Sequence, residues 1–163
     1  MTDILRIFFI IIMLTIALAS YFLVIGAIFT NRAAKTQRVI TSMPGRSFGV
    51  GLVNFAFFGT IALALFSLAE NAGSVVKAIL TLPAIMITAA LAVMLSFGLA
   101  GMVNLLGERI LHEVSTWKRT AWGTVILSFA CALPFVGWFL LLPYVGFVGI
   151  GAFILGLFQR ENK

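Results

Sequence analysis

Long apolar runs separated by short polar segments dominate the hydropathy pattern of the chain. The first run, residues 4–29, would be about 39 Å long as a helix, enough to cross a bilayer with some tilt. Because apolar residues continue well beyond Ala17–Ala19, we interpret this run as an uncleaved anchor and not as a signal peptide. Residues 48–68 and 83–106 predict two further spans, with Pro83 in the first turn of the third helix.

The last apolar run, residues 121–158, is too long for one span. As a single helix it would be about 57 Å long, nearly twice the thickness of the hydrocarbon core. Proline and glycine cluster near residues 134–137, which predicts a tight turn there. We favour a helical hairpin, with a short helix up to Leu133 and a longer one from Trp138, and a single kinked span is the alternative.

Two polar segments indicate the orientation of the chain. Residues 31–47 carry four basic residues and no acidic one, and residues 107–120 carry three basic and two acidic residues. Under the positive-inside rule both segments are cytoplasmic, which puts the N-terminus outside and, with a hairpin, the C-terminus inside. Every Lys and Arg except Arg6 and Lys77 then lies inside. We expect headgroup contacts from Arg32, Lys35, Arg38, Arg46, Trp117, Lys118 and Arg119.

The second polar segment has a pattern of its own. Gly107 is expected to end the third span. After it, apolar residues recur at helical spacing with the charges on the other side. This pattern predicts a short amphipathic helix on the membrane surface within residues 107–120.

Composition supports a membrane location. The chain is 62% hydrophobic and 10% charged, with a mean hydropathy of +1.16, whereas a soluble domain is about a quarter charged. The sequence therefore predicts an all-α integral membrane protein with about three transmembrane helices and a C-terminal helical hairpin, four to five membrane helices in one domain, residues 1–163. The net charge is +6, and most basic residues lie between the apolar runs. This placement favours contact with lipid headgroups and argues against nucleic acid as a partner.

Few residues could carry chemistry. Cys131 and His112 are the only residues of their kinds, which excludes an intrachain disulfide and a multi-cysteine zinc site. No charged residue or histidine lies in the central third of any predicted span, where proton transport or intramembrane hydrolysis would need one. We therefore expect no catalytic residue, no cofactor and no metal. A lipid-modifying enzyme that uses His112 and Glu113 at the interface remains an alternative.

Small and amide side chains are the candidate interaction sites. Small residues let helix backbones approach closely in lipid, where the hydrophobic effect does not hold helices together. The similar segments "GLVNF" and "GMVNL" place Asn54 and Asn104 at similar depths, where they could hydrogen-bond to each other or line a small polar cavity. The candidates are Asn54, Asn104, Gly98, Gly101, Pro134, Gly137, Pro143, Gly146 and Gly149.

Several short motifs resemble those of a set of small polytopic bacterial membrane proteins of unknown function. The motifs are "PGRS-x-x-x-G" at the start of a span, "LP-x-x-G-W" at a turn, and a last helix rich in glycine and alanine. In that set, related segments occur attached to or near bactofilin-type polymer-forming proteins. The resemblance covers residues 44–158 and implies no established activity. The β-helical polymer domain is not found in this sequence.

These observations predict a non-enzymatic integral membrane protein that acts as a scaffold or accessory subunit of a larger membrane complex. Its expected partners are the lipid bilayer and either other membrane proteins or further copies of itself. The positive-inside pattern favours a bacterial cytoplasmic membrane, with the N-terminus out and the C-terminus in. The alternative function is a small channel or transporter that acts as an oligomer, with the turn near residues 134–137 as a re-entrant pore element.

Overall fold

The computed structural model of the chain describes residues 2–111, 115–133 and 135–158, and no strand occurs in these ranges. The helices are α1 (Thr2–Ile28), α2 (Thr30–Ser42), α3 (Pro44–Glu70), α4 (Ser74–Ile110), α5 (Thr116–Ala132), the π-helix η1 (Val136–Leu141) and α6 (Leu142–Phe158). Four apolar segments are long enough to cross a membrane: Leu5–Ile28, Pro44–Glu70, Ser74–Ile110 and Val136–Phe158. The prediction of an all-helical chain with several helices of membrane length is confirmed.

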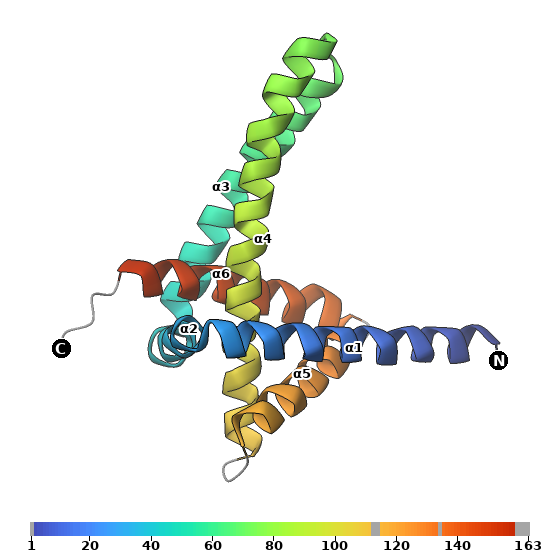
Figure 1. Cartoon of the computed structure of the whole chain (residues 1–163), viewed down its shortest axis with the longest axis vertical. Helices are drawn as coiled ribbons and strands as arrows, with labels where there is room; N and C mark the ends of the chain where they lie inside the picture. The colour runs from blue at the N-terminus through green and yellow to red at the C-terminus, as the bar shows by residue number, and fades with distance from the viewer. Residues whose placement is uncertain (1, 112–114, 134, 159–163) are drawn as a thin grey trace.

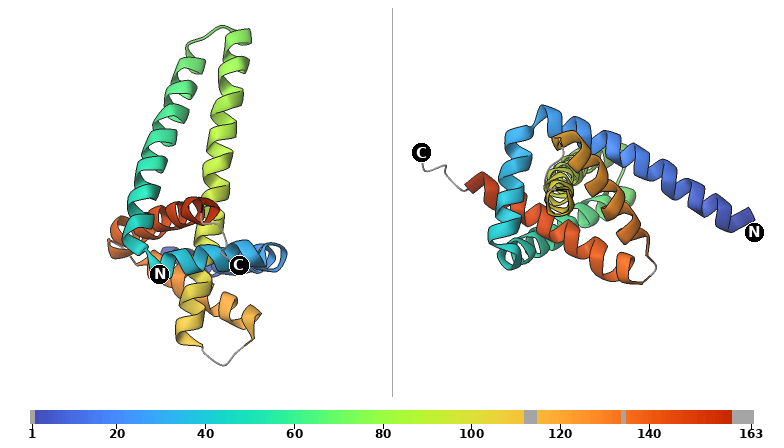
Figure 2. Two further views of the ribbon diagram at one scale, coloured as in Figure 1. Left: turned by 90° about the vertical axis from the view of Figure 1, so that its left-hand side faces the viewer. Right: turned by 90° about the horizontal axis from the view of Figure 1, so that it is seen from below.

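The long helices do not run in one direction (Figure 1). Helices α3 and α4 form a long antiparallel hairpin, and α1, α2 and α6 run crosswise to it near its base. Seen from below, α4 is viewed end-on with α1, α2, α5 and α6 around it (Figure 2). We call residues 52–70 and 74–95 the distal hairpin, and α1, α2, η1 and α6 the crosswise layer.

Helix α4 starts earlier and ends later than the sequence predicts. It begins at Ser74, after Gly73 in an extended conformation, and it continues through Pro83, which was expected in the first turn. A helix tolerates an internal proline here because apolar surroundings favour keeping all other backbone groups in the helical ladder. Gly107 does not end the helix either. A Cβ at Gly107 would overlap the carbonyl oxygen of Arg119, so this glycine lets α5 approach α4.

The two polar segments also differ from expectation. Most of residues 31–47 forms α2. This helix ends at Ser42, Met43 follows it, and α3 begins at Pro44. No separate surface helix lies in the described part of residues 107–120, because α4 takes the first residues and α5 takes the last. His112 and Glu113 lie outside the described residues, so the enzyme alternative that used them is not tested.

The break in the last apolar run is confirmed, and the two helices on either side of it pack on other helices of the chain. Helix α5 ends at Ala132 and η1 begins at Val136, close to the predicted turn. After the turn the helices separate: α5 packs on α1 and α4, and α6 packs on α3 and α4. The physical reason is the placement of glycine. Gly123 of α5 faces the backbone of α4, and Gly151 of α6 faces the backbone of α3.

Candidate functional site

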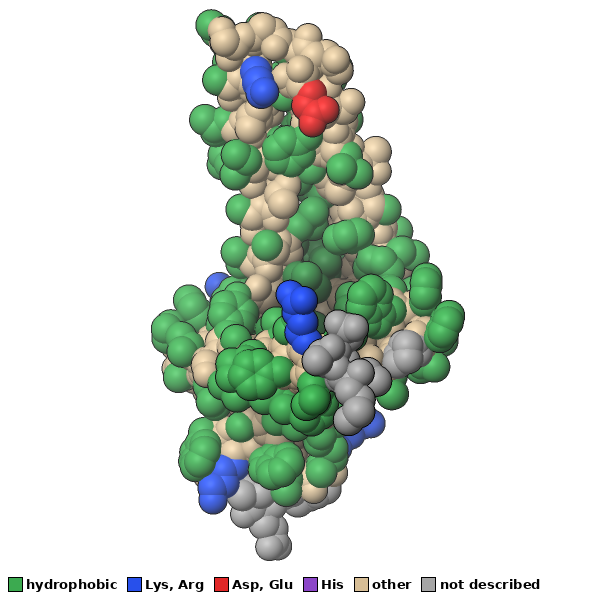
Figure 3. All heavy atoms as spheres, turned by 90° about the vertical axis from the view of Figure 1, so that its right-hand side faces the viewer, with side chains coloured by type: hydrophobic (Ala, Val, Ile, Leu, Met, Phe, Trp, Pro, Cys, Tyr) green, Lys and Arg blue, Asp and Glu red, His purple; other side chains and the backbone are tan. Residues whose placement is uncertain are grey.

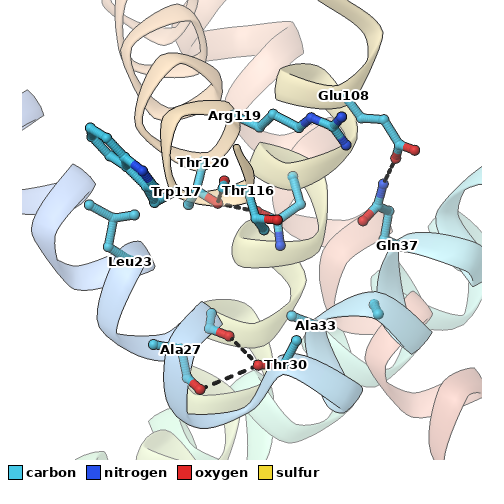
Figure 4. Close-up of a pocket in the computed structure, with 13 residues that line it drawn as sticks. Leu23, Ala27, Thr30, Ala33, Gln37, Glu108, Thr116, Trp117, Arg119 and Thr120 are labelled. Atoms are coloured by element: carbon cyan, nitrogen blue, oxygen red, sulfur yellow. Dashed lines mark hydrogen bonds between the residues drawn. The ribbon is translucent and has the colours of Figure 1, made fainter. Parts of the chain in front are cut away.

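A cleft of about 540 Å³, lined by apolar and polar side chains, lies between α1, α2, α4 and α5 (Figure 4). It is the place where polar side chains from the most helices converge in the described part of the chain. Its lining residues are Leu23, Gly26 and Ala27 of α1; Thr30, Ala33, Ala34 and Gln37 of α2; Asn104 and Glu108 of α4; and Thr116, Trp117, Arg119 and Thr120 of α5.

Two side-chain hydrogen bonds join helices around the cleft. The buried hydroxyl of Thr120 donates to Oδ1 of Asn104 at 2.8 Å and joins α5 to α4. The side-chain amide of Gln37 donates to the carboxylate of Glu108 and joins α2 to α4. Each bond holds a residue of α4, so α4 positions the polar groups that α2 and α5 contribute to the cleft.

The walls differ in chemistry. Arg119 and Glu108 place opposite charges in the same lining, while α1 contributes an apolar wall. Trp117 lies at the rim with 61% of its surface exposed, and the ammonium of Lys118 lies 5.5 Å from the centre of its ring. A second cleft of about 450 Å³ shares Gln37 and Glu108 and adds Arg38. With apolar and polar walls, the first cleft could hold a small polar or amphipathic group.

Among the described residues, the lining contains one carboxylate, that of Glu108. It contains neither histidine nor cysteine, and no group of three metal-ligating side chains occurs among the described residues. Asn104, Thr116 and Thr120 instead supply amide and hydroxyl groups. These groups can donate and accept hydrogen bonds to a bound polar group.

The two asparagines that the sequence pairs do not meet. Asn54 donates to the carbonyl of Val50 in its own helix at 2.8 Å, and Asn104 accepts from Thr120. The expected bond between them is wrong because the two residues lie on opposite sides of the crosswise layer. Asn54 belongs to the distal hairpin, and Asn104 lies farther along α4 than Gly101, which faces α2. The other role considered for Asn104, lining a polar cavity, agrees with its place in the cleft.

Most candidate glycines lie where helices cross. Gly98 of α4 meets Gly149 of α6 backbone to backbone, and Gly101 faces Thr36 of α2. A Cβ at Gly137 would overlap the carbonyl oxygen of Cys131, which explains the glycine at the turn. The remaining candidates are peripheral or not described: Gly146 would meet only the side chain of Leu95, Pro143 lies in the first turn of α6, and Pro134 lies outside the described residues.

The candidate headgroup residues gather at one end of the molecule. Arg32, Arg38, Arg46, Trp117 and Lys118 are exposed, and Lys35 and Arg119 are half-buried. All of them lie on α2, α5 or the first turn of α3. Sequence reasoning did not identify Gln37, Glu108 and Thr120 as site residues, because nothing in their spacing shows that α2, α4 and α5 meet.

Comparisons of the chain with protein-family models, with curated proteins and with solved structures give no match.

Proposed function

We propose that this chain is a non-enzymatic integral membrane protein that serves as a scaffold or accessory subunit of a larger membrane complex. The observation that carries the proposal is the distal hairpin, which projects from the rest of the molecule (Figures 1 and 2). Only 11% of the apolar window of α3 and 6% of that of α4 is buried within the chain. A surface so apolar needs lipid or another protein to cover it.

A groove along the distal hairpin supports a protein as part of that cover. Its volume is about 560 Å³, and its lining is apolar apart from two threonines. Ala56, Gly59 and Ala62 line one side of it, and Leu91 and Leu95 line the other. Small residues on one helix face allow another helix to approach closely in lipid. The occupant that fits this groove is an apolar transmembrane helix of a partner chain.

The orientation belongs to the same proposal. The basic residues of α2 and α5 favour the cytoplasmic leaflet, and the bacterial cytoplasmic membrane fits this asymmetry. The tip of the hairpin, which carries Glu70 and Lys77, then lies on the opposite side of the membrane.

Photo-crosslinking in the native membrane, followed by purification in gentle detergent and native mass measurement, tests the proposal. A photoreactive amino acid replaces Leu63, which lines the groove and is 71% exposed, and in the control it replaces Leu82, which is 63% exposed and does not line it. We expect a stoichiometric partner that crosslinks to position 63 and only lipid at position 82. A monomer whose two positions crosslink to lipid alone would contradict the proposal. A homo-oligomer would favour the channel alternative.

A further inference from the structure

We infer that only the α3–α4 hairpin crosses the bilayer, and that the crosswise layer lies along the cytoplasmic boundary of the membrane, partly sunk into one leaflet. This inference rests on the proposed membrane location and replaces the expectation that α1 crosses with its N-terminus outside. The interaction surface is the underside and rim of the layer, and its partner is the headgroup region of the cytoplasmic leaflet.

Geometry is the first argument. A helix that runs crosswise to the hairpin cannot share its direction through the membrane (Figures 1 and 2). Residues 52–70 of the distal hairpin are about 28 Å long and residues 74–95 about 33 Å, at 1.5 Å per residue. The hydrocarbon core is about 30 Å thick. The part of the hairpin beyond the layer therefore has about the length that is needed to cross the core.

Basic residues sort in the same way. Among the described residues, Lys77 is the one Lys or Arg of the distal hairpin, and every other one lies on the crosswise layer, on the base of α3 and α4, or on α5. Figure 3 shows basic side chains at the tip and at the level of the layer and below, with an apolar stretch between them. With α1 in the layer, Arg6 joins the cytoplasmic side as well. The positive-inside rule then fits better than with α1 as a span.

Tryptophan and tyrosine give an independent argument. Neither residue occurs in α3 or α4, although these two helices are long and apolar. All tryptophans and tyrosines lie on α1, α5, η1 and α6, and all are exposed: Tyr21, Trp117, Trp122, Trp138 and Tyr144. These side chains concentrate at the membrane–water boundary in membrane proteins, which places the elements that carry them at this boundary.

The depth of the layer follows from α1, which exposes large apolar side chains on most of its circumference, except on the side where Thr15 and Phe22 are buried. A helix that lay on the water side of the headgroups would present half of that surface to water. The apolar stretch of the distal hairpin, residues 52–68 and 78–95, is about 26 Å long, slightly shorter than the hydrocarbon core. A helix is about 10 Å thick. If the crosswise layer is partly sunk into the hydrocarbon at the base of the hairpin, it fills the few Å of the core that the hairpin does not span.

The opposite placement, with α1 and α6 as the spans, is disfavoured. Gly98 of α4 contacts Gly149, near the middle of the segment Val136–Phe158. If Val136–Phe158 crossed the membrane, its contact with the hairpin would lie near the bilayer midplane. The hairpin would then run within the hydrocarbon and hold Glu70 and Lys77 there, at a large cost in solvation.

The sidedness of the N-terminus tests the inference. In intact cells that express the full chain with Cys131→Ala, a tag with one cysteine is placed before Met1, and its labelling by a membrane-impermeant maleimide is measured. Ser74→Cys at the hairpin tip and Arg38→Cys on α2 are matched exposed controls. An epitope tag without cysteine at the same N-terminal position, read by antibody access, gives a second measurement that needs no substitution.

We expect Ser74→Cys to react from outside, and the N-terminal tag and Arg38→Cys to react only after the membrane is opened. Reaction of the tag from outside, together with Ser74→Cys, would overturn the inference because α1 would then cross. Reaction of Ser74→Cys on the same side as Arg38→Cys would overturn it because the hairpin would not cross. Neither result depends on capture of a partner, so this test and that of the proposed function fail separately.

Discussion

At the scale of single residues, glycines decide where the helices meet. Gly51 of α3 lies against α6, and a Cβ there would overlap the carbonyl oxygen of Phe147. Gly49, two positions earlier on the same helix, has nothing within 4 Å of where its Cβ would be. The two glycines look equivalent in the sequence, but only one is required for a helix crossing.

This difference predicts opposite effects of the same substitution. Gly51→Ala should lower the free energy of unfolding by about 1–3 kcal/mol, because backbone atoms of α6 must move to admit a methyl group. Gly49→Ala should leave it unchanged or raise it by up to about 1 kcal/mol, because alanine is the better helix former. Unfolding in detergent, followed by circular dichroism, measures both. Equal effects would show that α3 and α6 do not cross at Gly51.

The bond between α4 and α5 can be tested in the same way. Thr120→Val removes the donor to Asn104 and should cost about 0.6 kcal/mol and at most about 1.7 kcal/mol. Thr60→Val is the control, because the Thr60 hydroxyl bonds only to the carbonyl of Ala56 in its own helix. In a double-mutant cycle with Asn104→Leu, the coupling energy should be positive. Additive effects would mean that the bond does not form.

At the scale of elements, the turn between α5 and η1 is the one place where the described backbone is strained. Phe135 has φ 66° and ψ −64°, and it is the only described non-glycine residue with positive φ. Positive φ at a bulky residue is a rare and costly conformation. Its side chain is 78% exposed, so little packing within the chain offsets the strain.

Substitutions at Phe135 should therefore separate backbone strain from side-chain packing. Phe135→Gly should raise the free energy of unfolding by about 1 kcal/mol, since glycine adopts positive φ freely. Phe135→Val should lower it, because a β-branched residue is less tolerant of this conformation. Thermal unfolding of both variants in the same detergent gives the comparison. A stable valine variant with a weakened glycine variant would refute the role of strain here.

Elements were predictable from the sequence to the extent that hydropathy determines them. Apolar length predicted the long apolar helices and the break near residues 134–137, but not α2, which is polar. The start of α4 differs from the prediction because proline favours the first turn of a helix, although a long apolar helix can also contain it in its interior. The directions of the helices could not be predicted, because an apolar run specifies length and leaves direction open. Gln37, Glu108 and Thr120 were missed for the same reason.

At the scale of the whole molecule, charge is concentrated at one end. If the crosswise layer contacts the cytoplasmic leaflet, binding to anionic lipid should depend on its basic residues. Arg38→Gln should weaken the enrichment of anionic lipid around the protein in mixed-lipid nanodiscs, whereas Lys77→Gln at the tip of the distal hairpin should have a smaller effect. Lipid enrichment read by native mass spectrometry at low and high salt measures this. Equal effects of the two substitutions would contradict the asymmetry.

The central claim is that α1 lies along the membrane and does not cross it, and a depth profile along α1 tests it most directly. Spin labels at Leu5, Ile16 and Ala27 lie on nearly the same face of the helix and sample its start, middle and end. In nanodiscs, relative exposure to oxygen and to a polar relaxation agent reports the depth of each label. We predict similar depths at all three positions. A profile with Ile16 at the bilayer centre and the two ends at opposite surfaces would show that α1 spans the membrane, contradicting the account.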